Sequence, residues 1–128
     1  MVEFALILPI LLIALVGMLD FGRAIFAYNS VANAARSATR VAIVNQTVSE
    51  VEDAAENESV GLSPLTVVIA YEDGGTECSP ITRGCIASVE VSHAWMPATP
   101  IINAIIGPIT LDSSAAMPVE RVWPSPSP

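Results

Sequence analysis

Apolar residues are concentrated at the start of this chain. Residues 4–19 (FALILPILLIALVGML) are 16 consecutive positions without a charge, and Asp20 is the first charged residue after them. As an α-helix this segment is about 24 Å long, which is shorter than the roughly 30 Å hydrocarbon core of a bilayer. A helix through it spans a membrane only if it continues past Asp20 and Arg23 into the apolar residues 24–28.

The next segment continues the helical pattern. Residues 24–44 (AIFAYNSVANAARSATRVAIV) contain neither Pro nor Gly and are rich in alanine, the strongest helix former. We therefore predict one long helix over residues 1–44, whose apolar half, residues 4–28, needs an apolar environment such as a membrane. The alanines of residues 31–44 allow another backbone to approach closely, and for this part packing on the protein's own sheet is favoured over packing on a second membrane helix.

Pro9 breaks the hydrogen-bond pattern of this helix. Its nitrogen carries no hydrogen for the bond to the carbonyl oxygen of Ala5, and its ring clashes with the same carbonyl group. The sequence therefore predicts a kink or a locally melted turn at Pro9.

A secretory signal peptide is the main alternative for the start of the chain. Such a peptide begins with basic residues and ends with a small-x-small cleavage pattern. Here the residue before the apolar segment is Glu3, and the segment ends in Gly17-Met18-Leu19 without that pattern. These features favour a helix that the protein retains.

Residues 45–128 have the pattern of a small β-sheet domain. Three segments have β-branched or alternating apolar residues, namely residues 65–71, 85–95 and 109–119. The first two are joined by a segment rich in turn residues (EDGGTECSPITRG), which predicts an antiparallel pair. The expected fold class is α+β: a long N-terminal helix followed by a small antiparallel β-sheet of about three strands.

Three other segments connect or extend these strands. Residues 49–59 (SEVEDAAENES) predict a solvated acidic connector, helical or not, because such a run is usually a hydrated face rather than a metal site. Prolines bound the apolar residues 101–106, which we expect to cap the sheet edge or to lie against a neighbouring molecule. The final PSPSP, residues 124–128, predicts an extended tail.

The charge distribution separates the helix from the rest of the chain. The net charge is −8, composed of +1 over residues 1–44 and −9 over residues 45–128. Binding to nucleic acid needs surplus Lys and Arg, so this charge argues against a nucleic-acid partner. Hydrophobic residues make up 52% of the chain, which indicates that part of it needs an apolar partner.

The sequence offers little for catalysis. His93 is the only histidine, and it alternates with Val91 and Trp95 as a residue on a sheet face does. The chain has no glycine-rich phosphate loop and no histidine cluster. We therefore expect no enzyme activity, no bound metal and no cofactor.

The two cysteines flank the turn between the first two predicted strands. Cys78 and Cys85 enclose SPITRG, where a disulfide would close a ring worth about 2.5 kcal/mol on a loop-entropy estimate. Two free thiols or half a metal site are the alternatives, but the residues that would complete a zinc site are missing. A disulfide is favoured, and it implies an oxidising compartment.

The N-terminal segment VEFALILPILLIALVGMLDFGRAIFAYNSVANAAR resembles the start of the TadE-like family, pseudopilins or minor pilins of the tight-adherence (Tad) branch of type IV pili. The resemblance is specific over roughly residues 2–40 and weaker over residues 89–121. The residues that match the family pattern are Val2, Glu3, Phe4, Ala5, Pro9, Asp20, Phe21, Gly22 and Arg23.

This resemblance implies a type IV pilin-like subunit of an extracellular pilus with a role in surface adhesion. It implies that a prepilin peptidase cuts the chain, and that the pilus assembly machinery moves it from the inner membrane into a filament of this or other pilins. The residues expected to serve assembly are Glu3, Phe4, Pro9, Gly17, Asp20, Phe21 and Arg23.

Glu3 takes the role of the family's glutamate, which pairs with the N-terminal amine of an adjacent subunit. In mature type IV pilins that glutamate is normally the fifth residue, whereas here it is the third. Either two residues precede Met1, or cleavage falls elsewhere. Asp20 and Arg23 are three positions apart on one helix and are expected to pair with each other.

Two other functions remain open at this stage: a minor pseudopilin that primes assembly, and a membrane-anchored surface domain that binds a partner. Two sequons, at Asn45 (Asn-Gln-Thr) and Asn57 (Asn-Glu-Ser), are weak candidates for glycosylation.

Overall fold

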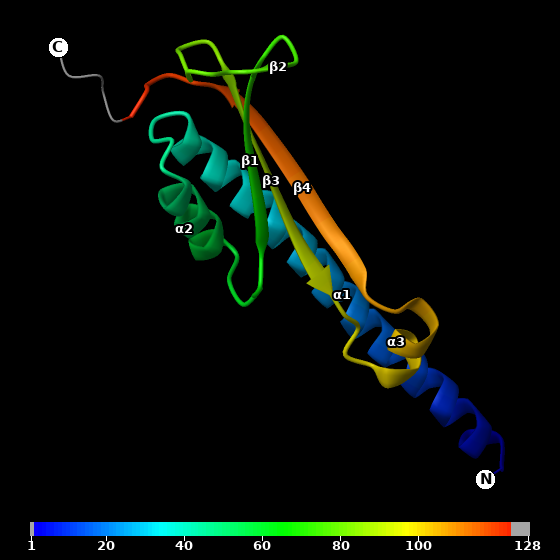
Figure 1. The fold of residues 1–128 in the computed structure, drawn as a ribbon. Coiled ribbons are helices and arrows are strands. Elements are labelled where there is room, and N and C mark those ends of the chain that lie inside the picture. Colours follow the sequence, from blue (N-terminus) through cyan, green and yellow to red (C-terminus); the bar gives the residue numbers. More distant parts are fainter. Residues whose placement is uncertain (1, 124–128) are drawn as a thin grey trace.

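A computed structural model of the chain describes the backbone of residues 2–123 and the side chains of residues 4–123. Figure 1 shows a long helix whose second half lies along a β-sheet and whose first half extends beyond it. In chain order the elements are α1 (Val2–Ala42), α2 (Val48–Glu58), β1 (Thr66–Asp73), β2 (Thr76–Glu77), β3 (Ile86–Trp95), α3 (Pro100–Ile106) and β4 (Ile109–Pro118). The predicted α+β fold, a long N-terminal helix followed by a small antiparallel sheet, is confirmed.

The sheet has four strands in the order β2-β1-β3-β4, and every pair is antiparallel. The predicted antiparallel pairing of the first two long strands is confirmed, with Ile69 opposite Val89. The strand β2 was not predicted. It follows a two-residue turn in which Gly74 and Gly75 both have positive φ, a conformation that glycine adopts without steric cost.

The core lies between the second half of α1 and the sheet. On α1 the residues turned inward are small, and Ala34, Ala35 and Ala38 are fully buried. From the sheet, Val89 and Val91 are buried in the same cluster. Since alanine side chains let the helix backbone approach the strands closely, the prediction that these alanines pack on the protein's own sheet is confirmed.

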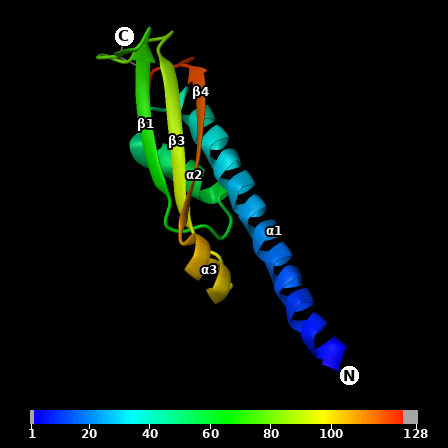
Figure 2. The ribbon, with the colours of Figure 1, turned by 90° about the vertical axis from the view of Figure 1, so that its right-hand side faces the viewer.

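The acidic segment forms α2, an amphipathic helix that packs on α1 rather than a simple connector. Val51 and Ala55 are buried in the common core, while the acidic side chains of α2 face solvent. The two apolar positions are four residues apart, which places them on one helix face. Figure 2 shows α2 behind the strands, level with the second half of α1 and away from the N-terminus.

Pro9 lies inside α1, and the helix is continuous on both sides of it. The locally melted turn expected at Pro9 is therefore absent from the described part of α1. Proline removes only the hydrogen bond that its own nitrogen would donate, and the bonds of the neighbouring residues keep the helix together. Helices in apolar surroundings commonly tolerate a proline in this way.

Backbone and side-chain hydrogen bonds fasten the segment after β4 to the end of α1. The N–H groups of Glu120 and Arg121 both donate to the carbonyl oxygen of Ile43 at 3.0 Å. The Gln46 amide donates to the Arg121 carbonyl oxygen at 2.8 Å and accepts from the Trp123 N–H at 2.6 Å. The predicted extended tail, residues 124–128, lies outside the described residues.

Candidate assembly surface

The first half of α1 has almost no contacts with the rest of the fold. Among the described residues, α1 is the one helix long and apolar enough to cross a membrane, and very little of its apolar part is buried. The exposed large apolar side chains of residues 4–19 are Phe4, Leu6, Ile7, Leu8, Ile10, Leu11, Leu12, Ile13, Leu15, Val16, Met18 and Leu19. An apolar surface of this extent marks a site for lipid or for other protein.

The predicted assembly residues fall into two groups on this helix. Phe4, Pro9 and Phe21 are exposed, so they are accessible to another molecule. Gly17 instead lies next to α3, and Asp20 accepts hydrogen bonds from the loop before α3. Glu3 lies in the first turn of α1, and its side chain is outside the described residues.

Asp20 connects α1 to the loop that enters α3. Its side chain is only 7% exposed. One carboxylate oxygen, Oδ1, accepts from the Ala98 N–H at 3.3 Å, and the other, Oδ2, accepts from the Thr99 N–H at 3.1 Å. Asp20 therefore holds a loop that is far away in the sequence, and the sequence analysis missed this role.

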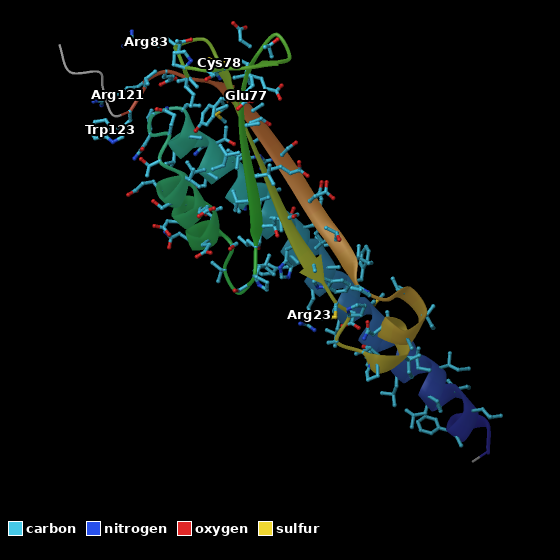
Figure 3. The ribbon with its side chains drawn as sticks, in the orientation of Figure 1. Arg23, Glu77, Cys78, Arg83, Arg121 and Trp123 are labelled. Carbon is cyan, nitrogen blue, oxygen red and sulfur yellow. A yellow bond between two sulfur atoms is a disulfide. The ribbon has the colours of Figure 1, made fainter. Side chains whose placement is uncertain are left out.

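The predicted pair of Asp20 with Arg23 is present. Arg23 Nη1 lies 3.8 Å from Asp20 Oδ1, and the Arg23 side chain is 61% exposed. Figure 3 shows Arg23 beside the start of α3, pointing away from the helix. The exposed guanidinium and the long separation make this the weaker of the two sets of contacts that Asp20 makes.

The helix α3 lies beside α1 and beyond the ends of β3 and β4. That residues 101–106 cap the sheet edge or lie against a neighbouring molecule stays a prediction. A Cβ atom added at Gly17 would lie 3.9 Å from Cδ1 of Ile102. On the side facing the N-terminus, Val16 and Ile101 are among the residues lining a shallow apolar groove between the two helices. Gly17 therefore gives α3 room to approach α1.

The predicted disulfide joins Cys78 and Cys85, with the two Cα atoms 6.4 Å apart. Cys85 is buried against Val119, and the bridge closes the loop before β3. Figure 3 shows Cys78, Glu77 and Arg83 together at the end of the sheet that lies away from the N-terminus. The disulfide therefore stabilises the end of the domain that is remote from the exposed half of α1.

Several aromatic and titratable residues of the sheet domain contact other parts of the fold. His93 Nδ1 donates to the carbonyl oxygen of Pro64 at 3.0 Å. Trp95 is buried. Trp123 is exposed, and the Arg121 guanidinium stacks on its ring at 5.0 Å. Burial raises the pKa of Tyr71, whose hydroxyl faces the end of α1.

The two sequons differ in their surroundings. The Asn45 side chain is partly buried, and its Oδ1 atom accepts from the Thr47 N–H at 3.0 Å. Asn57 is exposed on α2. Of the two, Asn57 is the more accessible, and glycosylation at either site stays a prediction.

The comparison with known proteins finds a match in one part of the chain, the N-terminal helix. The model of the family described as TadE-like protein matches residues 1–40, which is nearly the whole of α1. Neither the curated proteins nor the solved structures contain a match to this chain. The resemblance to the TadE-like family is thereby confirmed over the N-terminal helix.

Proposed function

We propose that this protein is a structural subunit of an extracellular Tad pilus, without enzyme activity, that polymerises by packing of the first half of α1 and serves surface adhesion. The observation that carries the proposal is the contrast within one continuous helix. Residues 4–16 are exposed, whereas Val31, Ala35 and Ala38 are completely buried in the domain. The first half therefore has the apolar residues of a hydrophobic core, but the described chain leaves most of their surface uncovered.

Exposed apolar surface costs about 25 cal/mol per Å² in water, so this half of α1 needs an apolar environment. A pilin meets two such environments in succession, the inner membrane before assembly and the core of the filament afterwards. A continuous α1 suits both, because it connects the apolar segment to the solvated sheet domain without a hinge in the described residues.

Glu3 is the residue through which we expect subunits to recognise each other. A carboxylate at the start of an apolar helix is costly to bury unless it is paired, and the N-terminal amine of an adjacent subunit is a suitable cation. Asp20 has partners within its own chain, so it does not need one from a neighbour. We propose that a prepilin peptidase exposes this amine and that the pilus machinery brings the two subunits together.

Electron microscopy of material sheared from producing cells tests this proposal, with mass spectrometry of the intact subunit from the same sample. We expect filaments in which this chain is a main component. The mass also gives the mature N-terminus and any attached sugar.

Two results would change the conclusion. A few copies per filament of another pilin would support a minor pseudopilin that primes assembly. Retention of the whole population in the membrane, with no filament containing it, would leave a membrane-anchored surface domain.

A further inference from the structure

The helix α3 and its flanking loops form a second apolar segment beside α1. Residues 94–111 are 18 consecutive positions without a charge. The exposed large apolar side chains of α3 are isoleucines, with Ile105 78% exposed, Ile101 57% exposed and Ile106 56% exposed. Figure 1 shows α3 beyond the ends of β3 and β4, on the side of the molecule toward the N-terminus.

The contacts with α1 determine how far along that helix the segment reaches. The loop before α3 is held at Asp20, and Ile102 lies over Gly17. The groove beside it extends to Leu12. From Leu12 to Asp20 is about 12 Å along a helix axis. The segment therefore lies beside the second part of the charge-free run of α1, on the N-terminal side of Asp20.

The backbone entering α3 suits an apolar environment. Pro97 and Pro100 have no N–H group, and the N–H groups of Ala98 and Thr99 both donate to Asp20. Four successive residues therefore present no free backbone donor. Unpaired backbone donors and acceptors both exclude loops from a bilayer, and these four residues avoid the part of that cost that comes from donors.

We propose that α3 inserts into the membrane surface next to α1, with Ile101 and Ile105 in contact with lipid, while the protein awaits assembly. This inference rests on one part of the proposed function, namely that α1 is anchored in the inner membrane before assembly. Once residues 4–19 enter the hydrocarbon, α3 must reach the same leaflet, since Asp20 and Gly17 connect it to that part of α1. The absence of charge favours lipid over an acidic or basic protein partner, and the exposed Arg23 then lies at the headgroups.

Depth-dependent fluorescence quenching on the full chain tests this proposal. The protein is reconstituted, with its disulfide intact, into vesicles of phosphatidylethanolamine and phosphatidylglycerol that contain doxyl-labelled lipid. Single variants Ile105→Cys, Leu15→Cys and Val68→Cys carry an environment-sensitive dye. Leu15 reports on α1, and Val68, which is 56% exposed on β1, is the matched control on the sheet domain.

We expect the dye at position 105 to be quenched several-fold more than the dye at position 68, with emission shifted to the blue. Quenching at position 15 but not at position 105 would overturn the inference and leave membrane anchoring intact. An unquenched but blue-shifted dye at position 105 would also overturn it, and would indicate a second copy of the chain over α3. If neither position 15 nor position 105 is quenched, the membrane stage of the proposed function fails as well.

Discussion

The two halves of α1 are both apolar, but they differ in the size of their side chains and in what covers them. In the first half, large residues such as Leu11 and Met18 are exposed on all sides of the helix. In the second half, alanines such as Ala35 and Ala38 are buried against the sheet. Small residues let the helix pack closely on the sheet of the same chain. Large residues instead present apolar surface that lipid or another protein can cover. Side-chain size therefore distinguishes the two roles where hydrophobicity alone does not.

The largest loss of stability is expected when a small buried residue in the second half of α1 is replaced by a large one, as found in the first half. Ala35→Leu adds a bulky side chain where the helix meets the sheet, and we expect it to lower the free energy of unfolding by about 3 kcal/mol. Denaturant unfolding of the sheet domain in detergent measures this. The matched control is Ala14→Leu, because Ala14 is exposed in the first half and should tolerate leucine. Equal stability of the two variants would contradict the division of the helix.

Removing the disulfide tests whether the sheet domain is stabilised independently of the exposed helix. The double variant Cys78→Ser, Cys85→Ser should lose about 2.5 kcal/mol of stability, because the eight-residue ring no longer restricts the unfolded chain. Denaturant unfolding gives the loss, and vesicle binding of the same variant should be unchanged. A variant that also fails to bind vesicles would show that the two regions are coupled.

Asp20 lies at the boundary between the two halves, and its loss should have a local effect. In Asp20→Ala the N–H groups of Ala98 and Thr99 lose their acceptor, so we expect faster amide hydrogen exchange in α3 and its entering loop. Exchange in β1 and β3 should stay the same. Arg23→Ala is the comparison, and it should change exchange less, since its ion pair is long and exposed. Similar exchange in both variants would contradict the assignment of Asp20 as the anchor of α3.

The smallest effect on the fold is expected from shortening a side chain in the first half. Leu11→Ala should change the free energy of unfolding of the sheet domain by less than about 0.5 kcal/mol, as for most exposed positions. Its effect should instead fall on membrane binding, because it removes apolar area that only an external partner covers. A loss of domain stability comparable to that of Ala35→Leu would contradict this account.

Local patterns were sufficient to predict part of the fold and of the candidate surface. The charge-free apolar run and the segment without Pro or Gly that follows it predicted α1, and the spacing of Asp20 and Arg23 predicted their ion pair, because both depend on neighbours within one helix. The turn-rich segment around the two cysteines predicted the disulfide and the β1 and β3 pairing. A two-residue turn at Gly74 and Gly75 was visible in the sequence and could have predicted β2.

Contacts between distant residues were not predictable in this way. Asp20 is 78 residues from Ala98, and nothing in the sequence near either residue indicates that they meet. The position of α3 on Gly17 and the packing of α2 on α1 are of the same kind, since both depend on the completed fold. The melted turn considered at Pro9 does not form, because the neighbouring hydrogen bonds keep the helix intact when one is missing, and a kink there stays a prediction.

The substitution Glu3→Leu tests most directly whether the first half of α1 is an assembly surface or only an anchor. Leucine makes the segment more apolar, so membrane insertion should be kept or improved, while the pairing with an adjacent subunit's amine is lost. The account predicts normal amounts of the variant in the membrane fraction and a loss of filaments in sheared material viewed by electron microscopy. Filaments as abundant as those of the parent chain would contradict it.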